Sequence, residues 1–419
     1  MDIGILYNLN WKKIAILALF LILCLALGFG LYYLFFKSET PIVTPPAVVT
    51  PGGNLPAVGP GEGGGGQQGE LPITGEGEIG ADAGEVSEVA SGGLTTTFPI
   101  VANQVTDPII QENGNNLNFY NPEDNKFYTV DAATGEMILL TDKEFFQVEN
   151  VYWSKGGQQA IITYPDGSKI FYDFIKRTQT TLSKSVEAPD FNNNGQVAYK
   201  YITNEPDNNW IVVARPDGGT ANLIEPMGRE SEAVQISWSP TKEVVAMYAK
   251  PIGLDKTEVF FIGLQGENFR SLIVDGSNFK GLWSPDGTKI LYHAVSGDNN
   301  YNPSLWIADA YGDNIGMHKF NLGLSTWVDK CLFITADIVY CAVPKNLSTG
   351  AGLYPEISYT SDDLIYKIDL ISGLTELIAD PFSQERENFS ISRLMLTNDG
   401  KILVFWDNNT KQVYRLNLR

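Results

Sequence analysis

The segment Trp283–Tyr292 reads WSPDGTKILY, which has the chemistry of a strand, a tight turn and a second strand. Proline fixes φ at the second turn position, aspartate tolerates the third, and glycine accepts the left-handed backbone of the fourth. Tryptophan at the end of the first strand offers a large apolar surface to a neighbouring sheet. Looser copies occur at residues 153–157, 192–195, 238–240 and 397–400, so the chain is built from a repeated β unit.

The spacing of tryptophans gives the period of this repeat. Trp238, Trp283 and Trp327 are 45 and 44 residues apart, and Trp153 precedes Trp238 by 85, close to two periods. A second series of short alternating strands recurs seven times, at Lys126–Ala132, Lys169–Phe174, Asn209–Arg215, Glu258–Leu264, Ser304–Ala310, Leu364–Leu370 and Gln412–Leu418. Each period therefore holds four strands, which predicts an all-β propeller of seven blades, with six as the alternative.

The last repeat ends after its third strand, because the sequence stops at Arg419. A blade without its outer strand would leave an unpaired edge. The segment Thr95–Val101 could supply that strand beside Gln412–Leu418, and Pro99 is compatible with an edge strand. We therefore expect the N-terminal end of the domain, residues 95–419, to close the ring.

The unit Trp283–Tyr292 resembles the repeat of TolB-like propellers, and the degenerate copies extend the resemblance over about residues 95–419. The resemblance implies a propeller of six or seven blades, similar to WD40-like repeats in outline, that acts in the cell envelope as a binding scaffold. The turn motif of that family is structural, so the resemblance carries over no active site.

Residues Ile14–Phe36 form an uncharged apolar run of 23 residues. This length suffices for a helix to cross a hydrocarbon layer about 30 Å thick. Lys12 and Lys13 precede the run, whereas Lys37 is closely followed by Glu39. The run therefore predicts a signal-anchor in the cell membrane, spanning residues 14–36 once, with a cytoplasmic tail at 1–13 and the propeller outside the cytoplasm. A cleaved signal peptide would have a shorter apolar core and a small-residue cleavage site.

Residues 37–94 are dominated by Gly, Pro, Ala and Glu, and between residues 39 and 100 there are eight acidic residues and no Lys or Arg. Such a segment cannot bury enough apolar surface to offset its chain entropy, so we expect a disordered linker. A flexible chain of this length has an end-to-end distance of about 40–45 Å. The linker would let the propeller reach above the membrane.

The formal net charge of −20 argues against nucleic acid as a partner, because the protein would repel phosphate. Only two histidines occur, and neither a metal-binding pattern nor a Gly-x-Ser-x-Gly motif appears. The sequence therefore predicts no cofactor, no metal and no catalytic site.

Four connections between the second and third strands of their blades are longer than a tight turn: Thr203–Asn209, Lys250–Thr257, Ser296–Pro303 and Pro344–Asp362. In a propeller these connections share one face, and long loops on a rigid scaffold often carry function. We therefore predict a binding surface there, with contacts from Asp207, Asp255, Lys256, Asp298, Asn299, Tyr301, Tyr354 and Tyr359. The other interpretation of these loops is neutral variation in length.

Cys331 and Cys341 lie symmetrically about Ala336 in CLFITADIVYC. If this stretch is a hairpin, the two cysteines face each other, and an extracytoplasmic location would permit a disulfide. The sequence leaves open a disulfide and two free buried thiols, with the free thiols slightly favoured.

Two functions fit these features. The first is a membrane-anchored scaffold outside the cytoplasm that binds a protein or glycan partner on one propeller face. The alternative is a carbohydrate-active enzyme that uses carboxylates in the central channel, for which a pair of carboxylates about 5–10 Å apart would be the signature. A structural spacer without a specific ligand is a third interpretation.

Overall fold

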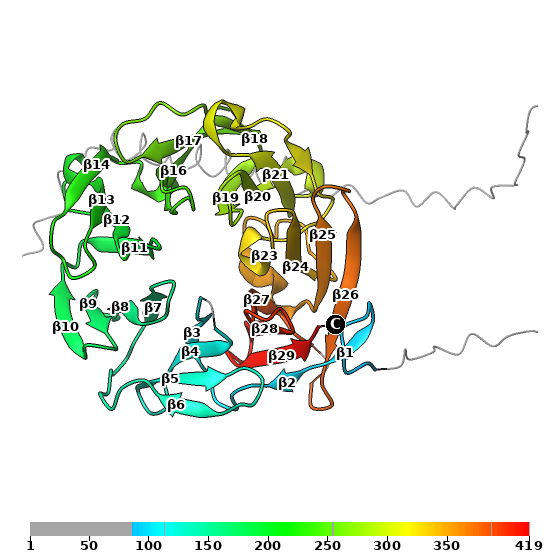
Figure 1. The fold of residues 1–419 in the computed structure, drawn as a ribbon. Coiled ribbons are helices and arrows are strands. Elements are labelled where there is room, and N and C mark those ends of the chain that lie inside the picture. The colour runs from blue at the N-terminus through cyan, green and yellow to red at the C-terminus, as the bar shows by residue number, and fades with distance from the viewer. Residues whose placement is uncertain (1–85, 113, 254, 387, 419) are drawn as a thin grey trace, which may run out of the picture. The chain divides into compact units, whose positions relative to one another are not determined.

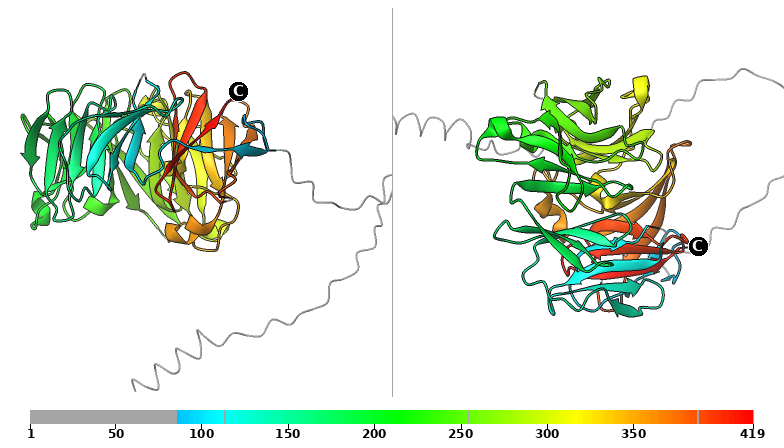
Figure 2. Two further views of the ribbon diagram at one scale, coloured as in Figure 1. Left: turned by 90° about the horizontal axis from the view of Figure 1, so that it is seen from below. Right: turned by 60° about the vertical axis from the view of Figure 1, so that its left-hand side comes forward.

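The computed structural model describes residues 86–112, 114–253, 255–386 and 388–418. Within them the strands form seven sheets arranged around a central axis, as Figure 1 shows. The prediction of an all-β propeller with seven blades is confirmed, and the six-bladed alternative is wrong. Figure 2 shows the ring from the side and in an oblique view, with the strands running between its two faces.

The blades share one order, in which the first strand lies nearest the axis and the last lies at the rim. The first strands are β3 (Thr106–Ile110), β7 (Asn150–Trp153), β11 (Val186–Phe191), β15 (Val234–Ile236), β19 (Ser277–Trp283), β23 (Cys331–Phe333) and β27 (Ile391–Leu396). The second strands are β4 (Asn116–Asn121), β8 (Gln159–Thr163), β12 (Val197–Tyr201), β16 (Val244–Pro251), β20 (Lys289–Val295), β24 (Ile338–Pro344) and β28 (Ile402–Asp407).

The third strands match the seven predicted strands to within a few residues. They are β5 (Lys126–Asp131), β9 (Lys169–Asp173), β13 (Trp210–Ala214), β17 (Lys256–Gly263), β21 (Pro303–Asp309), β25 (Asp363–Asp369) and β29 (Val413–Asn417). The outer strands are β6 (Met137–Leu139), β10 (Thr178–Leu182), β14 (Asn222–Pro226), β18 (Leu272–Asp275), β22 (Phe320–Asn321), β26 (Thr375–Phe382) and, in the last blade, β2 (Phe98–Pro99).

The repeated turn forms as its residues require. In the fifth blade the Gly287 N–H donates to the Ser284 carbonyl at 2.9 Å, and Gly287 has a φ of +72°. The Asp286 carboxylate accepts hydrogen bonds from the Ser284 hydroxyl at 2.6 Å and from the Thr288 N–H at 3.1 Å. Partial desolvation raises the pKa of Asp286, but the bonds from Ser284 and Thr288 outweigh it, so the pKa is lowered. Hydrogen bonds among the residues of the turn therefore stabilise it locally.

The repeated tryptophans hold adjacent blades together. Trp153, Trp238, Trp283 and Trp327 are each only 7% exposed. The indole N–H of Trp153 donates to the Asp107 carbonyl of the preceding blade at 2.8 Å, and that of Trp238 donates to the Asp190 carbonyl at 3.1 Å. Burying an aromatic side chain of this size stabilises the fold by on the order of 4 kcal/mol. The period of tryptophans in the sequence is thus the period of the contacts between blades.

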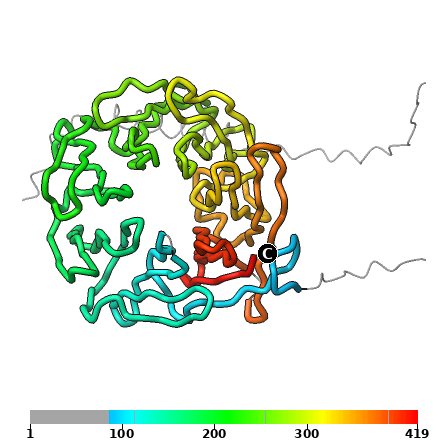
Figure 3. The backbone as a smooth tube through the Cα atoms, viewed as in Figure 1, coloured from blue at the N-terminus to red at the C-terminus, as the bar shows by residue number. Residues whose placement is uncertain are grey.

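The ring closes between the two ends of the described chain, which lie side by side in Figure 3. Phe98 and Pro99 of β2 pair antiparallel with Arg415 and Tyr414 of β29, and the Ile100 N–H donates to the Val413 carbonyl at 2.9 Å. The predicted closure is confirmed for Phe98–Ile100, which supply the missing neighbour of β29, whereas Thr95 and Thr96 pair with β26 of the sixth blade instead.

A strand that the sequence did not suggest precedes this closure. Strand β1 (Leu94–Thr96) runs parallel to β26 and gives the sixth blade a fifth strand. The preceding residues are also ordered, since Ala90 is buried and its N–H donates to the Asn417 carbonyl at 2.9 Å. The linker was predicted to end at residue 94, whereas isolated β-bridges to Thr95 and Asn417 already begin at Ser87 and Val89. This short stretch is ordered because its backbone can add hydrogen bonds to an open sheet edge.

The predicted tail at 1–13, the predicted membrane segment at 14–36 and residues 37–85 of the predicted linker lie outside the described residues. Among the residues that are described, no helix is long and apolar enough to span a membrane.

Candidate binding face

The long loops between second and third strands lie on one face of the ring, together with the connections from blade to blade. This follows from the order of strands in each antiparallel sheet, and we call it the long-loop face. The four connections predicted to be long correspond to residues 202–209, 252–255, 296–302 and 345–362. The second of them is short, because β16 extends to Pro251 and β17 begins at Lys256. The connections between first and second strands and between third and fourth strands lie on the opposite face.

The longest of these connections, residues 345–362, is fixed to the blade before it. The Gly350 N–H donates to the Asn300 carbonyl and the Gly352 N–H donates to the Tyr301 carbonyl, both at 2.9 Å. A Cβ atom on Gly352 would lie 2.6 Å from a methyl carbon of Val295, so only glycine permits this approach. The loop therefore lies against the fifth blade, although its ends belong to the sixth.

The same loop also reaches the seventh blade. Its 3₁₀ segment η6 (Pro355–Thr360) includes Tyr359, whose carbonyl accepts a hydrogen bond of 2.9 Å from the Asn409 side chain. At its base, the Lys345 N–H donates to the Asp362 carbonyl at 2.7 Å. Three neighbouring blades thus hold one loop in place.

Large apolar side chains are exposed on this part of the face. Tyr354 is 65% exposed and Tyr301 is 51% exposed, and Leu353, Ile357 and Tyr359 are exposed as well. Asn300 and Tyr301 have φ values of 53° and 56°, a conformation that costs free energy in two successive residues other than glycine. The backbone is therefore strained at the point where Tyr301 is presented to solvent.

The structure brings together five of the eight predicted binding residues. Asp298 and Asn299 lie in the 3₁₀ turn η3 (Gly297–Asn299), two and one residues before the Asn300–Tyr301 pair that the long loop contacts. In that loop, Tyr354 directly precedes η6 and Tyr359 lies within it. Together with Tyr301 these residues form one candidate surface over the fifth and sixth blades.

The other three predicted residues lie elsewhere on the face. Lys256 is the first residue of β17 and pairs with Asp275, so it belongs to a strand, because the β16–β17 ladder extends further than the alternating pattern indicated. The Asp255 carbonyl accepts a 2.7 Å bond from the Gly276 N–H. Asp207 lies in η1 (Pro206–Asn208), and no hydrogen bond or ion pair in the described part of the chain ties it to the other candidates.

The axis of the ring holds a channel of about 960 Å³ lined mainly by the first strands of the blades. Three basic and three acidic side chains line it: Lys155, Lys280, Arg393, Asp190, Glu232 and Asp329. Lys280 pairs with Asp329 at 2.7 Å and Lys155 pairs with Asp190 at 3.8 Å. These ion pairs join first strands or connections of adjacent blades, so the sequence pattern within one blade could not reveal them.

The rim of this channel touches the candidate surface. Asn278 lines the channel, and its side-chain amide donates to the Gly352 carbonyl at 3.2 Å. Asn278 lies at a β-bulge of β19 and has a φ of 51°. Bulges redirect side chains and are common beside functional sites. The long loop is therefore in contact with the mouth of the channel.

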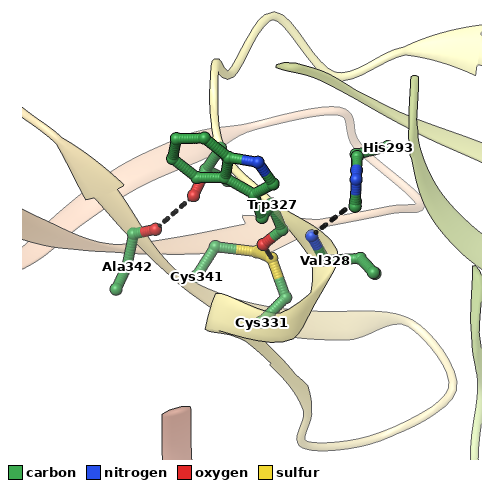
Figure 4. Close-up of a disulfide and its surroundings, with 7 residues drawn as sticks. His293, Trp327, Val328, Cys331, Cys341 and Ala342 are labelled. Carbon is green, nitrogen blue, oxygen red and sulfur yellow. Dashed lines mark hydrogen bonds between the residues drawn. A yellow bond between two sulfur atoms is a disulfide. The ribbon is translucent and has the colours of Figure 1, made fainter. Parts of the chain in front are cut away.

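Cys331 and Cys341 are paired residues of β23 and β24 and form a disulfide, which Figure 4 shows. The predicted hairpin is confirmed, and the slight preference for free thiols was wrong, because the register places the two cysteines directly opposite each other. The bond lies near the channel wall and packs close to Trp327 and Val328 (Figure 4).

His293 is buried beside this hairpin. Its Nδ1 accepts a hydrogen bond of 3.2 Å from the Val328 N–H. Burial disfavours the charged ring and lowers the pKa of His293 to about 4. The nearby Asp329 opposes this shift and Lys280 adds to it. His293 is thus a neutral acceptor that positions the start of β23. The described residues contain no group of three or more His, Cys, Asp or Glu side chains placed to hold a metal ion.

The sequence matches no protein-family model and no curated protein. Among solved structures, it is similar to the β-propeller domain of Swd1 (Cps50) from Myceliophteria thermophila, with a TM-score of 0.50 and 11% identity over 77% of this chain and 100% of that one. An oligogalacturonate lyase from Vibrio parahaemolyticus is also similar, with a TM-score of 0.46 and 10% identity over 77% of this chain and 93% of that one. At such low identity the first similarity supports the β-propeller fold alone, and the second is too weak to add to it.

Proposed function

We propose that this protein is a binding scaffold of the TolB-like type, tethered to the cell membrane through residues 14–36 and carrying its propeller outside the cytoplasm. Its long-loop face binds a protein or glycan partner of the cell envelope. The apolar run and the linker composition support the tether. The disulfide supports an oxidising compartment, where such bonds persist.

The observation that carries the proposal is the fixed loop at residues 345–362. Backbone hydrogen bonds hold it against Asn300 and Tyr301, while a side-chain bond from Asn409 holds its far end. A partner that binds Tyr301, Tyr354 and neighbouring side chains would not have to order the loop first, which lowers the entropic cost of binding. Tyrosine adds large contact area with few rotatable bonds.

A pull-down from envelope extract tests this function, with the full chain in detergent as bait. We expect the double variant Tyr354→Ala/Tyr359→Ala to recover at least tenfold less of the bound partner than the wild type, since exposed aromatic anchors commonly contribute more than 1 kcal/mol each. Tyr311→Ala is the matched control, because Tyr311 is also an exposed tyrosine but follows a third strand and lies on the opposite face. Equal recovery by the double variant and the control would overturn the proposal.

The alternative function is a carbohydrate-active enzyme, favoured by the three carboxylates in the channel. Asp190 and Asp329 are engaged by Lys155 and Lys280, which suits a structural role better than acid–base chemistry. Glu232→Gln tests this alternative. Polysaccharide cleavage by the wild type that falls at least a hundredfold in this variant would favour the enzyme over the scaffold.

A further inference from the structure

A second cavity, of about 530 Å³, opens beside η3 between the outer halves of the fourth and fifth blades. This volume is within the range of small-ligand pockets. The cavity belongs to the long-loop face, because its walls include the loop before β21 and the connection after β22. The side chains that matter for its chemistry are Asp275, Asp298, Asn299, Ser304, Trp306 and Asn321.

One wall of the cavity is a single face of the fifth blade. Ser304 and Trp306 are two residues apart on β21, so their side chains lie on the same side of the sheet. Asn321 of β22 is the direct partner of Trp306 and therefore shares that side. Trp306 also packs against the apolar core between the fourth and fifth blades. This packing fixes the indole ring in place.

The opposite wall is formed by Asp275, the last residue of β18 in the fourth blade. Lys319 connects the two walls, since its Nζ lies 2.6 Å from the Asp275 carboxylate and 5.6 Å from the centre of the Trp306 ring. The ammonium group compensates the charge of Asp275 and occupies a position over the indole. A cationic ligand would therefore find this aromatic position already taken.

The polar groups of the cavity are held in defined orientations. The Asn299 side-chain amide donates to the Ser304 and Ser325 hydroxyl oxygens, both at 3.0 Å. These bonds leave the Asn299 side-chain oxygen as an acceptor and the serine hydroxyl protons as donors. Asp298 makes no hydrogen bond or ion pair with any other described residue, so its carboxylate can accept two hydrogen bonds from a ligand.

We propose that this cavity binds a sugar residue of a neutral glycan. Sugar hydroxyls both donate and accept hydrogen bonds, which matches the serine hydroxyls, the amides of Asn299 and Asn321, and the free carboxylate of Asp298. Trp306 is only partly buried, so the part of its ring that neither the core nor Lys319 covers offers an apolar surface to sugar C–H groups. Phosphate or uronate groups would be repelled by Asp298. The inference rests on the proposed scaffold function and specifies that its partner is a glycan.

Isothermal titration of the full chain in detergent with tetrasaccharides tests this site. The probes are neutral β-1,4-linked tetramers of glucose, xylose and N-acetylglucosamine, and a hexuronic acid tetramer is the anionic comparison. We expect at least one neutral tetramer to bind and the anionic tetramer to bind at least tenfold more weakly. Asp298→Ala should weaken the neutral tetramer at least tenfold, because it removes hydrogen bonds to a charged acceptor.

The chain itself supplies a matched control. Asp313 occupies the same Gly-Asp-Asn sequence in η4 (Gly312–Asn314), on the opposite face of the same blade. Asp313→Ala should bind like the wild type, whereas Asn321→Ala and Trp306→Phe should bind more weakly. Trp306→Phe keeps an aromatic ring in the core, so it separates loss of binding from loss of folding.

The glycan site is overturned if Asp298→Ala, Asn321→Ala and Trp306→Phe all bind a neutral tetramer as tightly as the wild type does. It is also overturned if no neutral tetramer binds to the wild type. The scaffold proposal is judged separately by Tyr354→Ala/Tyr359→Ala. If that variant loses its envelope partner while no tetramer binds to the wild type, the scaffold stands and the glycan inference fails.

Discussion

The buried His293 predicts that part of the protein's stability is lost in mild acid. Its ring is neutral in the folded state, with a pKa of about 4, against an ordinary value of 6.5 in the unfolded chain. In the folded state Nδ1 of His293 accepts a hydrogen bond of 3.2 Å from the Val328 N–H. Protonation of Nδ1 would turn this acceptor into a donor that faces another donor. Between pH 6.5 and about 4 the unfolded chain binds a proton that the folded chain does not, so stability falls as the pH falls through this window.

The magnitude follows from the difference between the two pKa values. Linkage gives a loss of about 1 kcal/mol at pH 6, about 2 kcal/mol at pH 5 and about 3 kcal/mol at pH 4. Below pH 4 the loss levels off, because the folded state then binds the proton as well.

Urea unfolding followed by tryptophan fluorescence, at pH 7, 6, 5 and 4, measures this loss. Carboxylates also titrate in acid, so the informative quantity is the difference between the wild type and His293→Asn, whose side-chain oxygen can still accept from Val328. We expect the variant to lose about 3 kcal/mol less than the wild type between pH 7 and pH 4.

The other histidine of the chain is the control. His318 has an exposed side chain on the opposite face of the fifth blade, where it contacts Asp309 at 2.7 Å. The unfolding free energy of His318→Asn should change with pH as that of the wild type does, to within about 0.5 kcal/mol. If His293→Asn and the wild type lose the same free energy over this range, the assignment of the acid-sensitive group is refuted.

Three further predictions concern the contacts that hold the ring together. Denatured, unreduced protein should label at one thiol per chain and reduced protein at three, if Cys331 and Cys341 are bonded in solution. Lys330→Met should lower the unfolding free energy by about 3–5 kcal/mol, because it leaves the Asp363 carboxylate buried without its cation. Adding Asp363→Asn should recover at least about 1 kcal/mol of this loss, and a double variant without any recovery would contradict the explanation. A chain lacking residues 1–103 should aggregate and melt at lower temperature than one lacking residues 1–85, since only the latter keeps β1 and β2 on the edges of β26 and β29.

The candidate site shows where prediction from sequence ends. Asp298, Asn299 and Tyr301 could be proposed because they lie in a loop that is longer than a turn requires. The contact of that loop with Gly350 and Gly352 joins residues about fifty positions apart, and nothing in either segment marks the other. The cavity beside Trp306 was not predicted, since it forms only where Asp275 of the fourth blade faces side chains from the loop before β21 and from β21 and β22 of the fifth.

The blades themselves were determined by the sequence alone. Turn residues such as Pro285, Asp286 and Gly287, followed by alternating apolar residues, act within a few positions of each other, so each hairpin is encoded locally. The missing outer strand of the last repeat even indicated where the ring closes. These features can be predicted from the sequence because backbone geometry and side-chain alternation are short-range constraints.

Only the tertiary structure decided what the blades form together. The fifth strand β1, the bond between Cys331 and Cys341, the charge pairs of the channel and the course of residues 345–362 all depend on contacts between blades or on the exact register of strands. Such contacts depend on how strands pair and how neighbouring sheets pack, which short-range sequence patterns do not specify. The repeat fixed the shape of each blade, and the closed ring fixed the surface that the blades present.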